Sequence, residues 1–209
     1  MKLIRFGEAG NEKPGVCINQ EYFDVSGFVK DYDETFFATD GVANLAAIIE
    51  QNKIALPKIA SDTRLGAPVA RPSKIICIGL NYADHAKETN ATPPSEPVIF
   101  MKATSAICGP FDEVVIPKNS EKTDWEVELA VVIGKKGKYV PKADALEYVF
   151  GYTVINDISA RDCRREGQWI VSKGQDTFAP MGPYLVTKDE IANPHNLNLS
   201  LKLNGVEKQ

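Results

Sequence analysis

Glu126 and Glu128 form the pattern in this sequence that most directly indicates chemistry. They lie in an apolar segment, and side chains at positions i and i+2 of a β-strand point to the same face, roughly 7 Å apart along the backbone. Two neighbouring carboxylates repel each other unless a cation or water lies between them. A hard divalent cation removes this repulsion, because carboxylate oxygens suit Mg²⁺, Mn²⁺ or Ca²⁺. Spacing alone leaves a second interpretation open, in which both glutamates lie on a solvated sheet face.

Asp157 is a third candidate metal ligand. It ends the apolar segment 152–156, and functional side chains favour the ends of strands and the loops that follow them. Arg161 lies close behind it, in the polar segment 159–162. An ion pair between Arg161 and Asp157 is the structural alternative to a metal at this position.

His85 and Glu88 are the candidate pair for proton transfer, because positions i and i+3 are neighbours on a helical turn. A carboxylate that orients an imidazole and raises its basicity is what a general base acting on water requires. The alternative is a weak His–Glu pair on a helix surface. Lys102 and Lys173 are candidate cations for a substrate carboxylate or an enolate, although a single lysine is most often solvated.

The composition is that of an ordinary globular protein, with 44% hydrophobic and 25% charged residues in 209. A formal charge of −4 predicts no general attraction to nucleic acid or to anionic membranes. We expect a cytoplasmic protein, since the sequence has no long apolar segment and no signal-peptide pattern. The four cysteines form no Cys-x-x-Cys pair, which argues against structural zinc.

Two regions are expected along the chain. Residues 1–70 are predicted to form a small N-terminal domain, with strands at 2–6, 15–18 and 22–25 and a helix over 44–51 that Asn44 caps. A segment with two prolines and a glycine, 64–72, reads as the connection. Residues 71–209 are expected to form the second, metal-binding domain, with strands predicted at 74–79, 98–102, 126–133 and 152–158 and a short helix at 143–149.

The last residues predict a hairpin. Residues 197–203 alternate apolar and polar side chains as a strand does, and Asn204-Gly205 is a strong hairpin signal. Only four residues remain for the return strand. We therefore expect the second domain to be incomplete at its C-terminal end, the alternative being a frayed terminus on a complete domain.

Taken together, five segments resemble the fumarylacetoacetate hydrolase family. They are 78–85, 96–102, 124–129, 156–162 and 173–178, in the order in which that family carries them. The resemblance implies a mainly β, mixed α+β protein with a β-sandwich roll catalytic domain and a small N-terminal domain. It also implies a homodimer and a bound Mg²⁺, Mn²⁺ or Ca²⁺.

The resemblance also assigns roles to residues. Glu126, Glu128 and Asp157 match the metal ligands. His85 and Glu88 resemble the water-activating pair of the acylpyruvase branch, and Lys173 matches the active-site lysine. Arg161 and Lys102 match positions expected to bind substrate.

The implied activity is hydrolysis of the C3–C4 bond of a 2,4-dioxo acid, either a sugar-derived 2,4-diketo-3-deoxy acid or an acylpyruvate. The products are pyruvate or a close relative and a second carboxylic acid. One alternative is a lyase or decarboxylase that acts on a 2-oxo acid such as oxaloacetate, or on ureidoglycolate. The family's C-terminal Thr-Gly-Thr-Pro loop has no match here, so a second alternative is an inactive, truncated protein that binds metal or dimerises.

Overall fold

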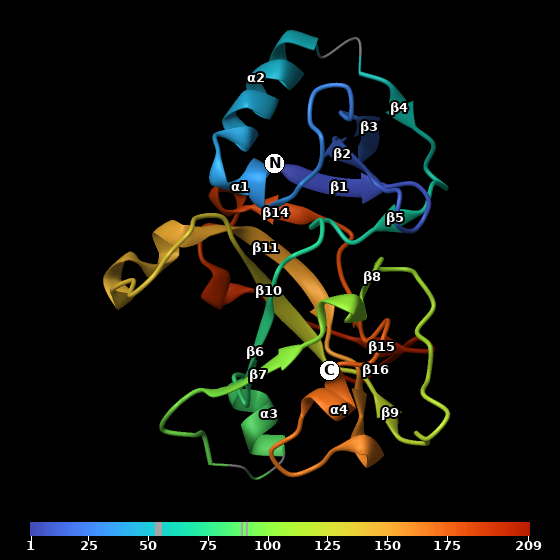
Figure 1. Ribbon diagram of the computed structural model, residues 1–209, viewed down its shortest axis with the longest axis vertical. Coiled ribbons are helices and arrows are strands. Elements are labelled where there is room, and N and C mark those ends of the chain that lie inside the picture. The colour runs from blue at the N-terminus through green and yellow to red at the C-terminus, as the bar shows by residue number, and fades with distance from the viewer. Residues whose placement is uncertain (53–55, 89, 91) are drawn as a thin grey trace.

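The computed structural model describes residues 1–52, 56–88, 90 and 92–209. It consists mostly of short strands with few helices, which confirms the predicted mainly β class (Figure 1). The helices are α1 (Glu34–Ala38), α2 (Gly41–Asn52), α3 (Ala83–Glu88) and α4 (Ile170–Lys173). Five 3₁₀ turns lie between strands: η1 (Thr104–Ala106), η2 (Lys142–Tyr148), η3 (Arg161–Cys163), η4 (Lys188–Glu190) and η5 (Pro194–Asn196).

The largest sheet has the strand order β10-β11-β14-β1-β2-β3-β4, with β5 pairing on β1. Its strands are β1 (Lys2–Phe6), β2 (Lys13–Ile18), β3 (Glu21–Asp24), β4 (Lys58–Ile59), β5 (Leu65–Gly66), β10 (Val127–Ile133), β11 (Val149–Asn156) and β14 (Leu185–Thr187). Figure 1 shows β14 between β1 and β11, so strands from both ends of the sequence meet in one sheet. That residues 1–70 are a domain of their own stays a prediction.

Four two-stranded sheets complete the structure. They are β6 (Ile75–Gly79) with β7 (Val98–Lys102), β8 (Ile107–Cys108) with β13 (Ala179–Pro180), β9 (Thr123–Asp124) with β12 (Ser159–Ala160), and β15 (Lys202–Leu203) with β16 (Val206–Glu207). The buried core spans both halves of the large sheet, from Leu3 and Val16 to Ile155 and Leu185.

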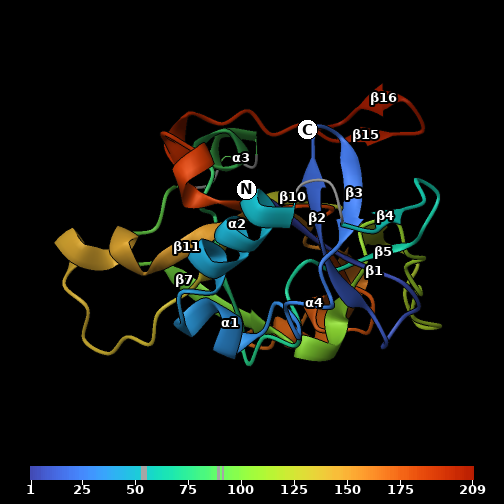
Figure 2. The same ribbon diagram turned by 90° about the horizontal axis from the view of Figure 1, so that it is seen from above.

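Two local predictions are wrong. Asn44 does not cap α2, which begins at Gly41, and the Asn44 N–H already donates to the carbonyl of Asp40 at 2.9 Å inside the helix. The segment 143–149 forms the 3₁₀ turn η2 rather than an α-helix, and it projects from one side of the molecule (Figures 1 and 2).

The C-terminal hairpin forms, but its first strand is much shorter than predicted. Only Lys202–Leu203 is strand, paired with Val206–Glu207 at the edge of the molecule (Figure 2). Alternation alone does not make a strand, because an extended backbone needs a partner for its hydrogen bonds. In the described part of the chain, residues 197–200 have no such partner strand. Asn204 and Gly205 both have positive φ, as the tight turn requires.

No helix among the described residues has the length and apolar character that crossing a bilayer requires.

Candidate metal centre

The pairing of β10 with β11 places two carboxylates side by side. Val127 lies opposite Asn156, so Glu126 directly precedes one strand and Asp157 directly follows the other. The Asp157 N–H donates to the carbonyl of Glu126 at 2.8 Å, and the Asn156 side chain accepts from the Glu126 N–H at 3.1 Å. Backbone geometry therefore holds both side chains at the same end of the strand pair.

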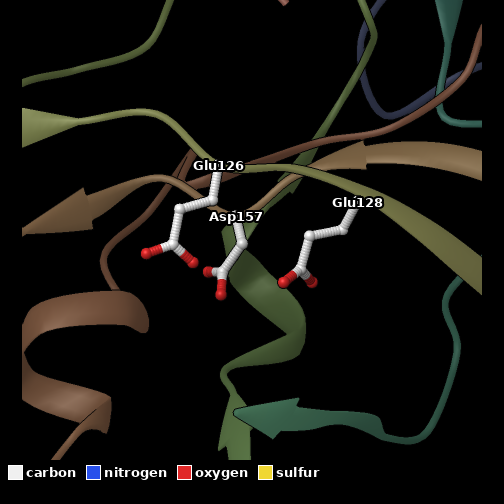
Figure 3. Close-up of side chains that lie close together, drawn as sticks. All are labelled: Glu126, Glu128 and Asp157. Carbon is white, nitrogen blue, oxygen red and sulfur yellow. The ribbon is translucent and has the colours of Figure 1, made fainter. Parts of the chain in front are cut away.

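Glu128 lies in β10 two positions after Glu126, so both side chains project from the same face of the chain. Carboxylate oxygens of Glu126, Glu128 and Asp157 all lie within 4.8 Å of one another, and Figure 3 shows the three groups turned toward one space. Asp157 is buried, while the two glutamates are half-buried. The structure thus gathers the three predicted ligands into a partly enclosed acidic cluster.

Two lysines from other elements contact the buried carboxylate. Lys102, at the end of β7, donates to Asp157 Oδ1 at 2.5 Å and to the carbonyl of Ile158 at 3.1 Å. Lys173, at the end of α4, donates to Asp157 Oδ2 at 2.6 Å and to Glu126 Oε2 at 2.8 Å. Burial lowers the pKa of Lys102, and the charge of Asp157 partly opposes that effect.

The helix α4 is fixed against the strands that follow Asp157. Ser172 donates to the carbonyl of Ala160 at 2.7 Å, and the Lys173 ammonium donates to Ser159 Oγ at 2.8 Å. These bonds are buried. They hold Lys173 beside the acidic cluster instead of in solvent.

Arg161 contacts different acids from the one that the sequence suggested. Its guanidinium lies 2.7 Å from Glu126 Oε1 and 2.9 Å from Asp124 Oδ2. The cations on Asp157 are Lys102 and Lys173. The alternative pairing of Arg161 with Asp157 is therefore not what the structure shows.

Glu128 is the carboxylate of the cluster that lacks a cation in contact, among the residues that the structure describes. Burial raises its pKa to about 7, and the charges of Asp157 and Glu126 act in the same direction. The ionised form of Glu128 is therefore stabilised by any cation that enters the cluster. Each Asp157 carboxylate oxygen accepts a hydrogen bond from one of the two lysines. Because a carboxylate oxygen has two lone pairs, each keeps a second lone pair for a metal. The three oxygen donors thus fit a hard divalent cation.

His85 and Glu88 both lie on α3, at i and i+3 as predicted. They line the same cavity as the three carboxylates, and this cavity has a volume of about 970 Å³. His85 is half-buried and Glu88 is exposed. The Tyr82 hydroxyl, just before α3, accepts a hydrogen bond from the Leu129 N–H of β10 at 2.9 Å. This bond ties the His85 helix to the strand that carries Glu128.

Three residues that contact the site were not predicted from the sequence: Asp124, Ser159 and Tyr82. Each lies inside a segment that carried the family resemblance, so a signal for its presence existed. Their contacts join residues far apart in the chain, such as Tyr82 with Leu129, and local spacing does not report those contacts.

Comparison with known proteins agrees with this geometry. The family model described as fumarylacetoacetate (FAA) hydrolase C-terminal matches residues 74–209. A Burkholderia orbicola protein, provisionally named as a hydrolase, is 50% identical over 208 residues, which cover 98% of this chain and 73% of that protein.

Solved structures are similar over the whole chain. Maleylpyruvate hydrolase from Sphingobium sp. SYK-6, solved with manganese(II) and pyruvate, has a TM-score of 0.82 at 29% identity, covering 100% of this chain and 75% of that one. The 5-carboxymethyl-2-hydroxymuconate delta-isomerase from Mycobacterium smegmatis has a TM-score of 0.72 at 32% identity, covering 100% and 74%. The acidic cluster and the manganese-containing neighbour both indicate a divalent metal.

Proposed function

Because this chain belongs to the fumarylacetoacetate hydrolase family, we propose that it hydrolyses the C3–C4 bond of a 2,4-dioxo acid with the help of a divalent metal ion. The observation that supports this most is the cluster of Glu126, Glu128 and Asp157, bordered by Lys173 and sharing one cavity with His85. A 2-oxo acid offers two oxygens to a metal and develops negative charge when the C–C bond breaks. The site provides cations for that charge and a histidine for water.

We assign the metal to the three carboxylates of the cluster. When bound there, a divalent ion would act as a Lewis acid toward the 2-oxo acid. The charge balance supports the assignment, because Glu128 is the carboxylate that no lysine or arginine contacts in the described structure. Mg²⁺, Mn²⁺ and Ca²⁺ all suit an oxygen-only set, and relative activity with each metal is to be measured.

The chain's own residues then account for the proton and electron movements. His85 takes a proton from water, with Glu88 orienting the imidazole, and the hydroxide oxygen bonds to C4. The C3–C4 bond breaks with its electron pair moving to C3, which gives an enolate and a carboxylic acid. The ammonium of Lys173 stabilises the enolate charge. Arg161 adds positive charge at the cavity, and the buried Lys102 holds the Asp157 carboxylate in place. Protonation at C3 completes pyruvate.

The test is pyruvate release from acetylpyruvate, measured with purified protein after chelator treatment and after return of Mg²⁺, Mn²⁺ or Ca²⁺. We expect activity to depend on added metal and to fall at least tenfold in Glu128→Gln. Glu121→Gln, an exposed acid outside the cavity, is the matched control. Activity that is unaffected by chelation and by Glu128→Gln would reject the proposal.

A lyase or isomerase acting on a 2-oxo acid is the second candidate, because one similar solved structure is named as an isomerase. The two reactions differ in their need for activated water. His85→Ala removes the base that a hydrolase needs, so acetylpyruvate hydrolysis should fall at least a hundredfold. If His85→Ala retains a larger fraction of wild-type activity in oxaloacetate decarboxylation than in acetylpyruvate hydrolysis, the lyase is favoured.

A further inference from the structure

Ser159 is a fully buried serine beside the acidic cluster, in β12 and two residues after Asp157. Its hydroxyl donates to the carbonyl oxygen of Asp157 at 3.1 Å. Its Oγ also lies 2.8 Å from Nζ of Lys173. A hydroxyl has a single proton, and here the carbonyl takes it, because a carbonyl oxygen only accepts. Ser159 therefore faces the Lys173 ammonium as an acceptor.

All three N–H groups of the Lys173 ammonium have an acceptor. Two acceptors are carboxylate oxygens, Asp157 Oδ2 at 2.6 Å and Glu126 Oε2 at 2.8 Å, and the third is the hydroxyl of Ser159. The centre of the Phe100 ring lies 5.2 Å from Nζ. Because an ammonium has three donors and no acceptor, these bonds fix both the position of Nζ and the direction of each N–H.

The three acceptors differ in how a bound metal would affect them. Glu126 and Asp157 are two of the carboxylates to which we assign the metal. A divalent ion would share their negative charge, which weakens their attraction for the ammonium, and the ion would itself repel the ammonium. Ser159 is neutral and is not one of the assigned ligands, so its hydrogen bond does not compete with the metal. It is the acceptor best able to retain Lys173 in the loaded site.

We propose that Ser159 is a positioning residue, which holds the Lys173 ammonium in place when the metal is bound and so allows it to stabilise the enolate. This inference rests on the proposed function. The bond between Ser159 and Lys173 is buried, and a buried donor that loses its acceptor is costly to leave unpaired. Without the hydroxyl, the ammonium would turn toward its other partners or toward solvent, and its charge would no longer face the developing enolate.

The experiment separates enolate stabilisation from metal binding. Calorimetry measures Mn²⁺ affinity of the metal-free protein and then the affinity of the manganese-loaded protein for oxalate, a planar dianion that resembles the enolate of pyruvate. We expect Ser159→Ala to bind oxalate at least tenfold more weakly, with Mn²⁺ affinity within twofold of wild type. In acetylpyruvate hydrolysis kcat should fall at least tenfold while KM stays within threefold, because the enolate forms only after substrate has bound. Ser159→Thr keeps the hydroxyl and should restore part of both losses.

Ser120→Ala is the matched control. Ser120 is also a buried serine, and it donates to Asp162 at 2.7 Å, but it does not line the metal cavity. It should keep wild-type oxalate affinity and kcat. Melting temperatures check that the variants fold, and Ser159→Cys, whose thiol is a weaker acceptor, replaces Ser159→Ala if that variant does not fold.

The outcomes distinguish the role of Ser159 from the proposed function. If the wild type hydrolyses acetylpyruvate and Ser159→Ala keeps both kcat and oxalate affinity, the role of Ser159 is wrong and the proposed function stands. An equal loss of Mn²⁺ and oxalate affinity would also overturn it, because Ser159 would then act on the metal ligands instead of Lys173. If the metal-loaded wild type neither binds oxalate nor hydrolyses acetylpyruvate, the proposed function is wrong and this inference is withdrawn with it.

Discussion

The backbone N–H of Asp157 donates to the carbonyl oxygen of Glu126 at 2.8 Å, although the two residues come from different strands. This single bond sits where β10 begins and β11 ends, and it places both carboxylates at the rim of the sheet. A third acid, Glu128, projects into the same space. Repulsion from Asp157 and Glu126 makes the ionised form of Glu128 less favourable while no metal is bound.

Glu128→Gln is expected to weaken metal binding and to make the metal-free protein more stable. The pKa of Glu128 is raised to about 7 from an ordinary value of 4.5. Between these two pH values the folded metal-free protein keeps a proton on Glu128 that the unfolded chain has released. Its contribution therefore lowers stability as pH rises from about 4.5 through 7. We expect the metal-free variant to be about 1 kcal/mol more stable than wild type at pH 8, with no gain near pH 4.

Urea unfolding at the two pH values, without metal, measures this change, and isothermal titration measures metal affinity. The same variant should bind Mn²⁺ at least tenfold more weakly. A variant that is less stable than wild type at pH 8 would contradict the proposed repulsion.

Tyr82→Phe should loosen the helix that carries His85. The lost hydroxyl leaves the Leu129 N–H without its acceptor, which costs about 1 kcal/mol. Hydrogen exchange at the Leu129 amide should become faster, and kcat should fall while Mn²⁺ affinity stays within twofold. Tyr139→Phe, at a tyrosine that is 92% exposed, is the control. Unchanged exchange at Leu129 would show that the bond is absent in solution.

Asp112→Asn tests the contact between the N-terminal residues and the loop after β8. Arg64 binds Asp112 through two hydrogen bonds of 2.8 and 2.6 Å and also donates to the carbonyl of Gly7. These bonds lower the pKa of Asp112, so its contribution is present above the unfolded pKa and is lost as pH falls through the folded pKa.

We expect Asp112→Asn to lower the free energy of unfolding by about 2 kcal/mol at pH 7 and by much less near pH 3. Denaturant unfolding at both values measures the difference. Asp62→Asn, an exposed acid, should change neither. An equal loss at pH 3 and pH 7 would mean that the charge of Asp112 is not responsible.

The expected homodimer is testable through the β6–β7 sheet. The register pairs Ile76 with Met101 and Ile78 with Ile99, and all four side chains are exposed on the face opposite Lys102. Since Ile99 is 66% exposed, burial against a second copy would be favourable. Light scattering should give twice the 22.9 kDa chain mass, and Ile99→Glu should shift the protein toward monomer. A wild-type monomer would contradict the prediction.

Sequence patterns were sufficient for the elements whose evidence is local. Period-two alternation and short apolar segments predicted the strands that became β10 and β11, because a strand's side chains alternate whatever lies beside it. The spacing of Glu126 and Glu128 and the position of Asp157 at a strand end predicted that these acids share a region. The same local evidence failed at 197–200, where alternation is present without a partner strand.

What the sequence by itself determined is the set of chemically able residues and the family that carries them. Only the tertiary structure decided their pairing: Lys102 and Lys173 converge on Asp157, while Arg161 turns to Asp124 and Glu126. It also decided that β14 joins β1 to β11, and that Arg164 stacks on Trp169 beside the cavity. The physical reason is that such contacts depend on how separate sheets and turns pack, and no local periodicity encodes that packing.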